Sequence, residues 1–369
     1  MNTITDTLLK QIERGMEGKN WGFNIGLPKL QDMTDGVVPS TYTLLFSPSG
    51  CGKSSLTLYS YIYRPLMEHL DDNKFKVTYF SLEMSAEMLM AKLLCMYIFE
   101  TYHIQISIKD LLSRRKGHVL DNKTFGIVKD CKGWMEKVER IITIHDKQLS
   151  ADTLYCILMN ELEANGRFEE HGNRKIYFPK DPEQVHLVVI DHLSLVMRKN
   201  GRSLKEEMDL ISSYLVTLRN MCKISPLVIM QANRNATSMD RRKEGLSNLS
   251  ISDIKDTSSA SQDAEIVIAL FNPYKEKLNS YRGYDVKSLG QNFRVITVLK
   301  NRYGESDVEI GCAFYGNISW FAEMPRPENI NSYAKYENPD WLIGKNSYEC
   351  DDRQETKEDK DNNELKFVF

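Results

Sequence analysis

Two glycines, a lysine and two serines stand close together near residue 50, in the order Gly50-Cys-Gly-Lys-Ser-Ser55. Glycines let successive backbone N–H groups converge on one anion, and a helix that starts at Lys53 would add the positive end of its dipole. The Lys53 ammonium would then reach the β- and γ-phosphates of a nucleotide, and the Ser54 hydroxyl would bind Mg²⁺. The spacing therefore predicts a phosphate-binding loop for ATP or another NTP, formed by Ser49, Gly50, Cys51, Gly52, Lys53, Ser54 and Ser55.

The flanking segments supply the elements that such a loop needs. Residues 42–46 form an apolar run typical of a short buried strand, and residues 56–69 carry apolar side chains at helical spacing. The consensus motif has a glycine where this chain has Ser47. An ordinary glycine-rich turn into a helix is the alternative, but the strand before the loop and the helix after it favour nucleotide binding.

Three further apolar runs end in a polar residue that could take part in chemistry. Residues 76–83, 185–191 and 226–231 read as strands, and they end in Glu83, Asp191 and Gln231. The carboxyl ends of parallel strands lie at the crevice where open α/β sheets bind ligands. We therefore expect Glu83 to polarise the attacking water, Asp191 to hold the Mg²⁺ shell together with Ser54, and Gln231 to sense the γ-phosphate. In the alternative interpretation, Glu83 only decorates the start of a helix.

Basic residues gather in three polar segments. Residues 197–205 form a basic, glycine-containing loop, and residues 232–255 form a polar segment long enough to be functional. Residues 300–304 form the turn Lys300-Asn-Arg-Tyr-Gly304. A Lys-x-Arg turn far along the chain from the phosphate-binding loop fits an arginine finger that acts on another subunit. It fits a solvated turn equally well, and the spacing leaves both interpretations open.

Composition narrows the class of protein. The 369-residue chain is 41% hydrophobic, and its net charge of −3 excludes a basic coat for nucleic acid but allows local basic loops. No apolar run approaches the roughly 18 residues of a membrane span, and no signal-peptide core is present, so we expect no membrane partner. The seven cysteines are scattered, and the histidines lack metal-ligand spacing, which argues against a zinc site or a disulfide framework. We expect an intracellular, reducing compartment.

The two ends of the chain differ from its centre. Residues 4–16 place Ile4, Leu8, Ile12 and Met16 on one helical stripe, which either packs on its own domain or docks on a neighbouring subunit. Residues 166–184 read as a solvated insertion. From residue 345 onward the chain is acidic and lacks a core-forming pattern. We divide the chain into a linker or docking helix (1–20), a nucleotide-binding domain (21–330) and an acidic tail that we expect to be disordered (331–369).

Taken together, these motifs resemble the RecA-like motor domain of the DnaB family of replicative helicases. The string Phe80-Ser-Leu-Glu-Met-Ser85 is the most specific part of the resemblance. The other matching segments are the lead-in at residues 26–39, Ile190-Asp-His-Leu193, Gln231-Ala-Asn-Arg234, residues 252–265 with their Gln-Asp-Ala ending, and Lys300-Asn-Arg-Tyr-Gly304. They occur in the family's order, which makes chance agreement a poor explanation.

The resemblance implies an α/β fold of the RecA-like P-loop NTPase class, a mostly parallel twisted sheet flanked by helices, with a short N-terminal docking helix. It implies an ATP-dependent DNA helicase that forms a ring, a hexamer in the family, translocates on single-stranded DNA and unwinds the duplex at the fork. Lys300 and Arg302 of a neighbour would then assist Lys53, Glu83 and Gln231 in catalysis. Two loops would hold DNA, through Arg198, Lys199, Arg202 and Lys205 and through Lys255, Asp256 and Ser258. Primase, a helicase loader and other replisome proteins are the further partners that it implies.

The chain departs from the family pattern in three places. Ser47 replaces the first glycine of the phosphate-binding loop, and residues 255–258 read Lys-Asp-Thr-Ser where the family has Arg-Glu-Ser-Gly. The family's globular N-terminal collar has no counterpart, which favours a phage or mobile-element member that works in the cytoplasm of a bacterial host. Two other functions stay open: a RecA-like regulatory or repair ATPase that hydrolyses ATP on oligomerisation or DNA binding without unwinding, and a non-catalytic ring.

Overall fold

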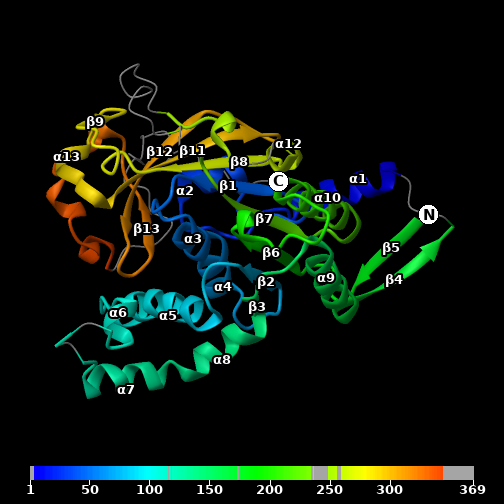
Figure 1. Cartoon of the computed structure of the whole chain (residues 1–369), viewed down its shortest axis with the longest axis horizontal. Helices are drawn as coiled ribbons and strands as arrows, with labels where there is room; N and C mark the ends of the chain where they lie inside the picture. The colour runs from blue at the N-terminus through cyan, green and yellow to red at the C-terminus, as the bar shows by residue number, and fades with distance from the viewer. Residues whose placement is uncertain are drawn as a thin grey trace, which may run out of the picture.

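A nine-stranded sheet runs through the centre of the molecule (Figure 1). The structure is a computed structural model, and it describes residues 4–114, 116–117, 119–172, 174–233, 236, 248–255 and 259–343. The strand order is β13-β12-β11-β8-β1-β7-β6-β2-β3. The strands are β1 (Thr43–Ser47), β2 (Phe75–Ser81), β3 (Ile142–His145), β6 (Val185–Asp191), β7 (Ser225–Gln231), β8 (Ile266–Phe271), β11 (Phe293–Asn301), β12 (Val308–Tyr315) and β13 (Trp320–Glu323).

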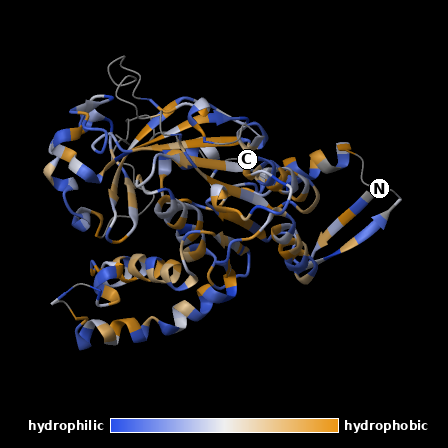
Figure 2. Cartoon of the chain, in the orientation of Figure 1, coloured by the Kyte–Doolittle hydropathy of each residue, from blue (hydrophilic) through white to orange (hydrophobic). Residues whose placement is uncertain are grey.

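The sheet has a parallel part and an antiparallel part. Strands β8, β1, β7, β6, β2 and β3 pair in parallel, whereas β11, β12 and β13 continue the sheet from β8 in antiparallel pairs. Every residue of β1, β6 and β8 is buried, as expected for strands covered on both faces. Figure 2 shows these central strands as largely hydrophobic. The predicted mostly parallel α/β sheet is confirmed.

Helices cover the sheet and extend beyond it. In Figure 1, α5, α6, α7 and α8 lie together below the sheet, and α9 and α10 lie towards the right. The α-helices are α1 (Ile4–Met16), α2 (Pro28–Thr34), α3 (Lys53–Leu56), α4 (Arg64–Glu68), α5 (Ala86–Tyr102), α6 (Ile108–Leu111), α7 (Asn122–Asp130), α8 (Lys132–Ile141), α9 (Ala151–Asn165), α10 (Leu204–Cys222), α12 (Ser259–Asp263) and α13 (Val286–Leu289). Short 3₁₀ turns are η2 (Leu193–Leu195), η4 (Ile251–Asp253), η5 (Gly290–Asn292), η6 (Pro327–Asn329), η7 (Ala334–Tyr336) and η8 (Pro339–Leu342).

The helix after the phosphate-binding loop is wound differently from a regular α-helix. It begins as α3, continues as the π-helix η1 (Thr57–Tyr63) and ends as α4. All seven residues of η1 are buried, because the helix packs between the sheet and α5. Apolar spacing therefore predicts a helix here correctly, but it does not show the wider π winding.

Two elements project from the right side of the molecule in Figure 1. Helix α1 has the predicted bounds and leaves the apolar side chains of its stripe exposed, with Ile4 90% and Met16 85% accessible. The insertion at residues 166–184 forms a hairpin of β4 (Gly166–His171) and β5 (Arg174–Pro179). An ion pair between Arg14 and Glu183 joins α1 to the residues after this hairpin.

Packed structure continues past residue 330. Turns η7 and η8 lie against β12, where the Trp341 indole donates a hydrogen bond to the Tyr315 hydroxyl at 2.6 Å and the Tyr336 side chain is buried. Residues 344–369, the rest of the predicted tail, lie outside the described residues. Among the described helices, none is both long enough and apolar enough to cross a lipid bilayer.

Candidate nucleotide-binding site

The phosphate-binding loop lies between β1 and α3, and its glycines adopt backbone conformations that other residues rarely take. Gly50 has φ of 74° and Gly52 has φ of 108°. A Cβ atom at Gly52 would also lie 3.1 Å from the Phe314 ring. Ser47, in contrast, is not among the residues with positive φ, so this position has no conformational need for the glycine of the consensus. The serine is therefore compatible with a working loop.

Lys53 is the first residue of α3 and is partly buried. Its ammonium lies 3.5 Å from the Ser47 carbonyl oxygen. Burial, above all, lowers the pKa of Lys53, while the charges of Asp191 and Glu83 act in the opposite direction. The ammonium thus stands in a partly desolvated position where an anion would stabilise it.

Asp191 ends β6, and its carboxylate is 1% exposed. The Tyr79 hydroxyl of β2 donates to Asp191 Oδ2 at 2.7 Å. Asp191 Oδ1 is buried and has no hydrogen-bond partner among the residues that the structure describes. A buried carboxylate oxygen without a donor is a suitable cation ligand.

These groups fit Mg²⁺ better than a metal held by protein ligands alone. No group of three or more His, Cys, Asp or Glu side chains suited to a metal ion occurs in the described part of the chain. Mg²⁺ commonly takes one or two protein oxygens and completes its shell with phosphate and water. The Ser54 hydroxyl and Asp191 Oδ1 would supply those protein oxygens.

Glu83 lies two residues beyond the end of β2, next to the Asp191 strand. Its side chain is 59% exposed, and its Oε2 lies 3.9 Å from Nε2 of His192. Burial lowers the pKa of His192, so the ring favours its neutral form. The histidines lack the spacing of metal ligands in the sequence, so His192 was not predicted to lie at the site. Its position directly after Asp191 is the signal that could have identified it.

Gln231 ends β7, the strand between the phosphate-binding loop and Asp191. It pairs in register with Ser47, and the next residue, Ala232, donates its N–H to the Ser47 carbonyl at 2.9 Å. The Gln231 carbonyl accepts a hydrogen bond from the Lys255 N–H at 3.0 Å. Backbone hydrogen bonds therefore connect the phosphate-binding loop to β7 at Ser47, and β7 to Lys255 at Gln231.

Residues 22–323 match the model of the DnaB-like helicase C-terminal domain, which is 302 of the 369 residues. The chain belongs to the DnaB-like helicase family. The replicative DNA helicase DnaB of Helicobacter pylori is 26% identical to this chain over 275 residues. That of Leifsonia xyli is 23% identical to it over 309 residues. These alignments cover 74% and 84% of this chain but 48% and 57% of the relatives, so the chain spans about half their length.

Two solved structures share the fold. The first is an isolated ATPase domain, which has a TM-score of 0.65 at 18% identity and covers 88% of this chain and all of its own. A DnaB-like replicative helicase, described together with its interactions with primase, has a TM-score of 0.63 at 18% identity over 88% of this chain and 68% of its own. The predicted RecA-like class and the family resemblance are confirmed.

In this DnaB-like domain the basic loop near residue 200 is partly neutralised by its own chain. Lys199 and Arg202 bind Asp152 Oδ2 at 2.7 and 3.2 Å, and Arg202 also lies 3.4 Å from Glu207. Arg198 and Lys205 are exposed. Lys255 is exposed at the edge of the second predicted DNA loop, whereas Asp256 and Ser258 lie outside the described residues. Contact between these two loops and DNA stays a prediction.

Lys300 and Arg302 lie away from the phosphate-binding loop of their own chain. The Lys300 ammonium donates to the carbonyls of Ser261 and Gln262 at 3.0 and 2.9 Å. Arg302 binds the Gln262 carbonyl at 3.2 Å and the Glu265 carboxylate at 3.3 Å. Both cations thus lie against α12 and the start of β8.

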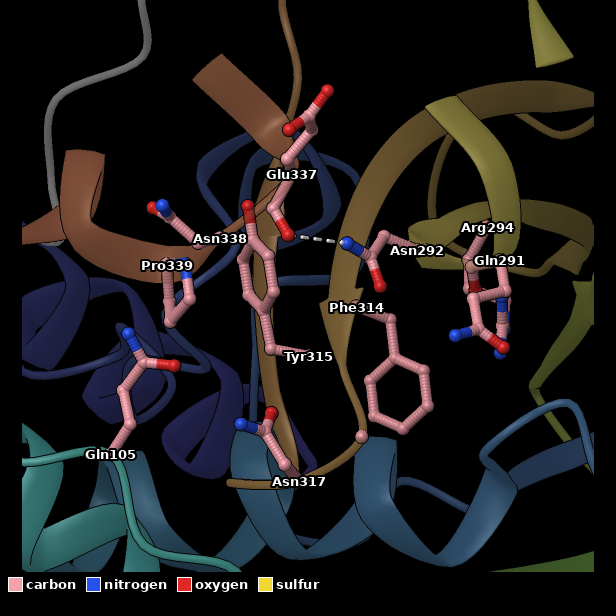
Figure 3. A pocket seen from close by; sticks show the side chains of 11 residues that line it. Gln105, Gln291, Asn292, Arg294, Phe314, Tyr315, Asn317, Glu337, Asn338 and Pro339 are labelled. Atoms are coloured by element: carbon pink, nitrogen blue, oxygen red, sulfur yellow. Dashed lines mark hydrogen bonds between the residues drawn. The ribbon is translucent and has the colours of Figure 1, made fainter. Parts of the chain in front are cut away.

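The far side of the phosphate-binding loop carries groups that sequence reasoning missed. Arg294 of β11 is buried and donates from Nε to the Cys51 carbonyl at 2.7 Å, and its guanidinium lies over the Phe314 ring. These two residues line a cavity of about 390 Å³ beside the loop (Figure 3), with Gln105, Gln291, Asn292, Tyr315, Gly316, Asn317, Glu337, Asn338 and Pro339. They come from strands and turns far along the chain, so no local spacing could have revealed them.

Proposed function

We propose that this chain is the NTP-driven motor of a ring-shaped replicative DNA helicase, which moves on single-stranded DNA and unwinds the duplex at the fork. One observation carries the proposal: the phosphate-binding loop, Gln231, Asp191 and Glu83 lie at or just beyond the ends of four adjacent parallel strands, in a chain that matches the DnaB-like helicase domain over residues 22–323. That arrangement is what NTP hydrolysis needs.

In the proposed hydrolysis step the loop amides and Lys53 bind the phosphates. The Ser54 hydroxyl and Asp191 Oδ1 would hold Mg²⁺, whose chemistry here is to neutralise phosphate charge. Glu83, exposed at the crevice, accepts a proton from the attacking water or orients it. The ring of His192 lies 3.9 Å from this carboxylate, directly after Asp191 in the chain.

The nucleotide base would occupy the cavity in Figure 3. Phe314 and Tyr315 supply aromatic faces, and the side chains of Gln105, Asn292, Asn317 and Asn338 make the rest of the lining polar. The cavity shares Phe314 with the loop, because the ring lies against Gly52. Part of its rim is held by the C-terminal turns, where Asn292 donates to the Glu337 carbonyl at 3.0 Å.

Loss of the γ-phosphate would affect DNA binding through the backbone hydrogen bonds that connect Ser47, Gln231 and Lys255. The Ala232 N–H holds the Ser47 carbonyl, and the Lys255 N–H holds the Gln231 carbonyl. A shift of Gln231 therefore moves the backbone of Lys255, at the edge of the proposed DNA loop. Lys255 and the loop at residues 198–205 would contact phosphates of the strand.

A neighbouring copy would complete each site in a ring, for which we propose six subunits. Because Lys300 and Arg302 lie against α12 rather than their own phosphate-binding loop, we assign them to the adjoining subunit's nucleotide. We propose that the protein works at replication forks in the cytoplasm of a bacterium, and a phage origin stays a prediction.

Helix α1 would hold neighbouring copies together. Its exposed apolar stripe needs a partner, and an apolar cavity of about 760 Å³ lies between α5, α7, α8 and β3. Met90, Leu94, Phe125, Val138 and Ile144 are among the side chains that line it. Figure 1 shows α1 and the helices around this cavity, α5, α7 and α8, on opposite sides of the chain, so we propose that α1 of one copy fills the cavity of the next.

A fork-substrate assay on the full chain tests the proposal. We expect ATP-dependent strand displacement that needs a single-stranded tail for loading. ATP hydrolysis without strand displacement would favour the regulatory or repair ATPase instead. A protein that neither hydrolyses ATP nor displaces a strand would overturn both functions.

A further inference from the structure

A second lysine reaches the phosphate-binding loop from outside the sequence motifs. The Lys275 ammonium donates to the Ser49 carbonyl at 2.6 Å. It also lies 3.0 Å from the position that a Cβ atom would take at Gly50. Lys275 belongs to the turn that follows β8, 226 residues after Ser49 in the sequence.

The turn that carries Lys275 is well anchored. The Lys275 N–H donates to Asn272 Oδ1 at 3.1 Å, and the Lys277 N–H donates to the Tyr274 carbonyl at 2.9 Å. Asn272 and Pro273 are buried, whereas the Lys275 side chain is exposed. The backbone therefore fixes where this lysine starts, and its ammonium stays accessible to a ligand in the loop.

The charge at Lys275 is not balanced by an acid of its own. No carboxylate among the described residues lies within 4 Å of its ammonium, whose one partner there is the neutral Ser49 carbonyl. It is close enough to Lys53 that its charge, after the larger effect of burial, helps to lower the pKa of Lys53. Two positive groups thus lie at one short loop, and no acidic side chain of the described residues pairs with the Lys275 ammonium.

Arg294 also contacts the loop, but unlike Lys275 it is buried and uses its donors on backbone carbonyls. Its Nε and Nη1 donate to the carbonyls of Cys51, Gln291 and Phe293, and the side chain is buried. An ammonium has three N–H donors, and Lys275 uses one of them on Ser49. The other two have no hydrogen-bond partner among the residues that the structure describes.

We propose that Lys275 is a second phosphate-binding lysine, which donates to an oxygen of the nucleotide's polyphosphate while it keeps its bond to the Ser49 carbonyl. This inference rests on the proposed nucleotide binding by the loop. Lys275 then contributes mainly to ground-state affinity, in contrast to Glu83, which acts on the water.

Equilibrium titration of the full-length protein with Mg²⁺ and either ADP or a non-hydrolysable ATP analogue tests the assignment. Lys275→Ala should weaken binding of at least one nucleotide about tenfold, which corresponds to ~1.4 kcal/mol. Lys275→Arg keeps the charge and should restore most of the affinity. Lys277→Gln, on the same turn and exposed but without a contact to the loop, is the matched control and should bind like wild type.

Steady-state kinetics add a second readout. Lys275→Ala should raise KM for ATP with little change in kcat, because ground-state binding is what it loses. Unchanged affinity for both nucleotides in Lys275→Ala, or an equal loss in Lys277→Gln, would overturn the inference while wild-type binding leaves the proposed function standing. A wild-type protein that binds neither nucleotide would overturn both.

Discussion

The side of the molecule that we propose binds nucleotide and the side that we propose meets DNA and neighbouring copies are built in opposite ways. On the nucleotide side, Asp191 is buried, held by Tyr79 and joined through the sheet to the loop and Gln231. On the other side, Lys300 and Arg302 bind α12 and Glu265 of their own chain, and the apolar stripe of α1 is exposed. A single chain thus contains the proposed phosphate-binding groups, whereas Lys300 and Arg302 would assist hydrolysis only from a neighbouring copy. We infer that binding of nucleotide and its use are separable in this protein.

The largest effect that we expect is a loss of NTP turnover from a change at the proposed nucleotide site. Lys53→Ala removes the cation at the centre of the loop and should lower NTP turnover by at least about a hundredfold, comparable to loss of a preorganised transition-state donor. Steady-state hydrolysis assays measure it, with Lys287→Ala, an exposed lysine of α13, as the charge-matched control. Turnover within a fewfold of wild type would show that the loop is not the hydrolytic site.

Glu83→Gln should separate nucleotide binding from nucleotide hydrolysis at the same site. The amide keeps the shape of the side chain but cannot accept the water's proton, so we expect normal nucleotide affinity and hydrolysis slower by about 10² or more. Glu87→Gln, an exposed glutamate in the first turn of α5, is the control. Near wild-type hydrolysis in Glu83→Gln would place the base elsewhere.

The buried histidine His186 in β6 should make the folded protein less stable at acidic pH. Burial lowers the pKa of His186 to about 4, and Thr78, Glu161 and Lys76 surround its ring. Between about pH 6.5 and pH 4 the unfolded chain binds a proton that the folded chain does not, so stability falls as pH falls through this window. The loss should be about 2 kcal/mol between pH 7 and pH 5.

Denaturant unfolding at the two pH values measures this loss. His186→Leu should show a smaller difference between pH 7 and pH 5 than wild type, whatever its absolute stability. His103→Asn, which changes an exposed histidine, should keep the full difference. If His186→Leu retained the full pH dependence, another group would be responsible.

A smaller effect is expected on the DNA-facing side. Lys255→Ala should make the plot of log K against log[salt] for single-stranded DNA shallower by about 0.7, the value for one phosphate neutralised. Nucleotide affinity should not change, because Lys255 touches Gln231 through its backbone. Fluorescence anisotropy at several salt concentrations, with Lys287→Ala as control, measures the slope. An unchanged slope would remove Lys255 from the DNA path.

Sequence patterns reveal the nucleotide side more completely than the other. β1, β2, β6 and β7 are predicted because each is a local run of apolar residues, and Glu83, Asp191 and Gln231 follow because each stands at the end of such a run. Arg294 and Lys275 could not be predicted, since they reach the loop only after distant strands pair. The π winding of η1 and the packing of η7 and η8 on β12 likewise depend on tertiary contacts.

A ring motor of this design requires Arg302 to act on the nucleotide of a neighbouring copy, and mixing two inactive variants examines that requirement. Arg302→Ala should bind nucleotide nearly normally but hydrolyse it poorly, since fingers of this kind contribute about 10³ to 10⁵ in rate. Added Lys53→Ala protein should restore part of the activity, because mixed interfaces pair an intact loop with an intact Arg302. No rescue at any mixing ratio, together with a wild-type rate per chain that does not depend on protein concentration, would rule out action between subunits.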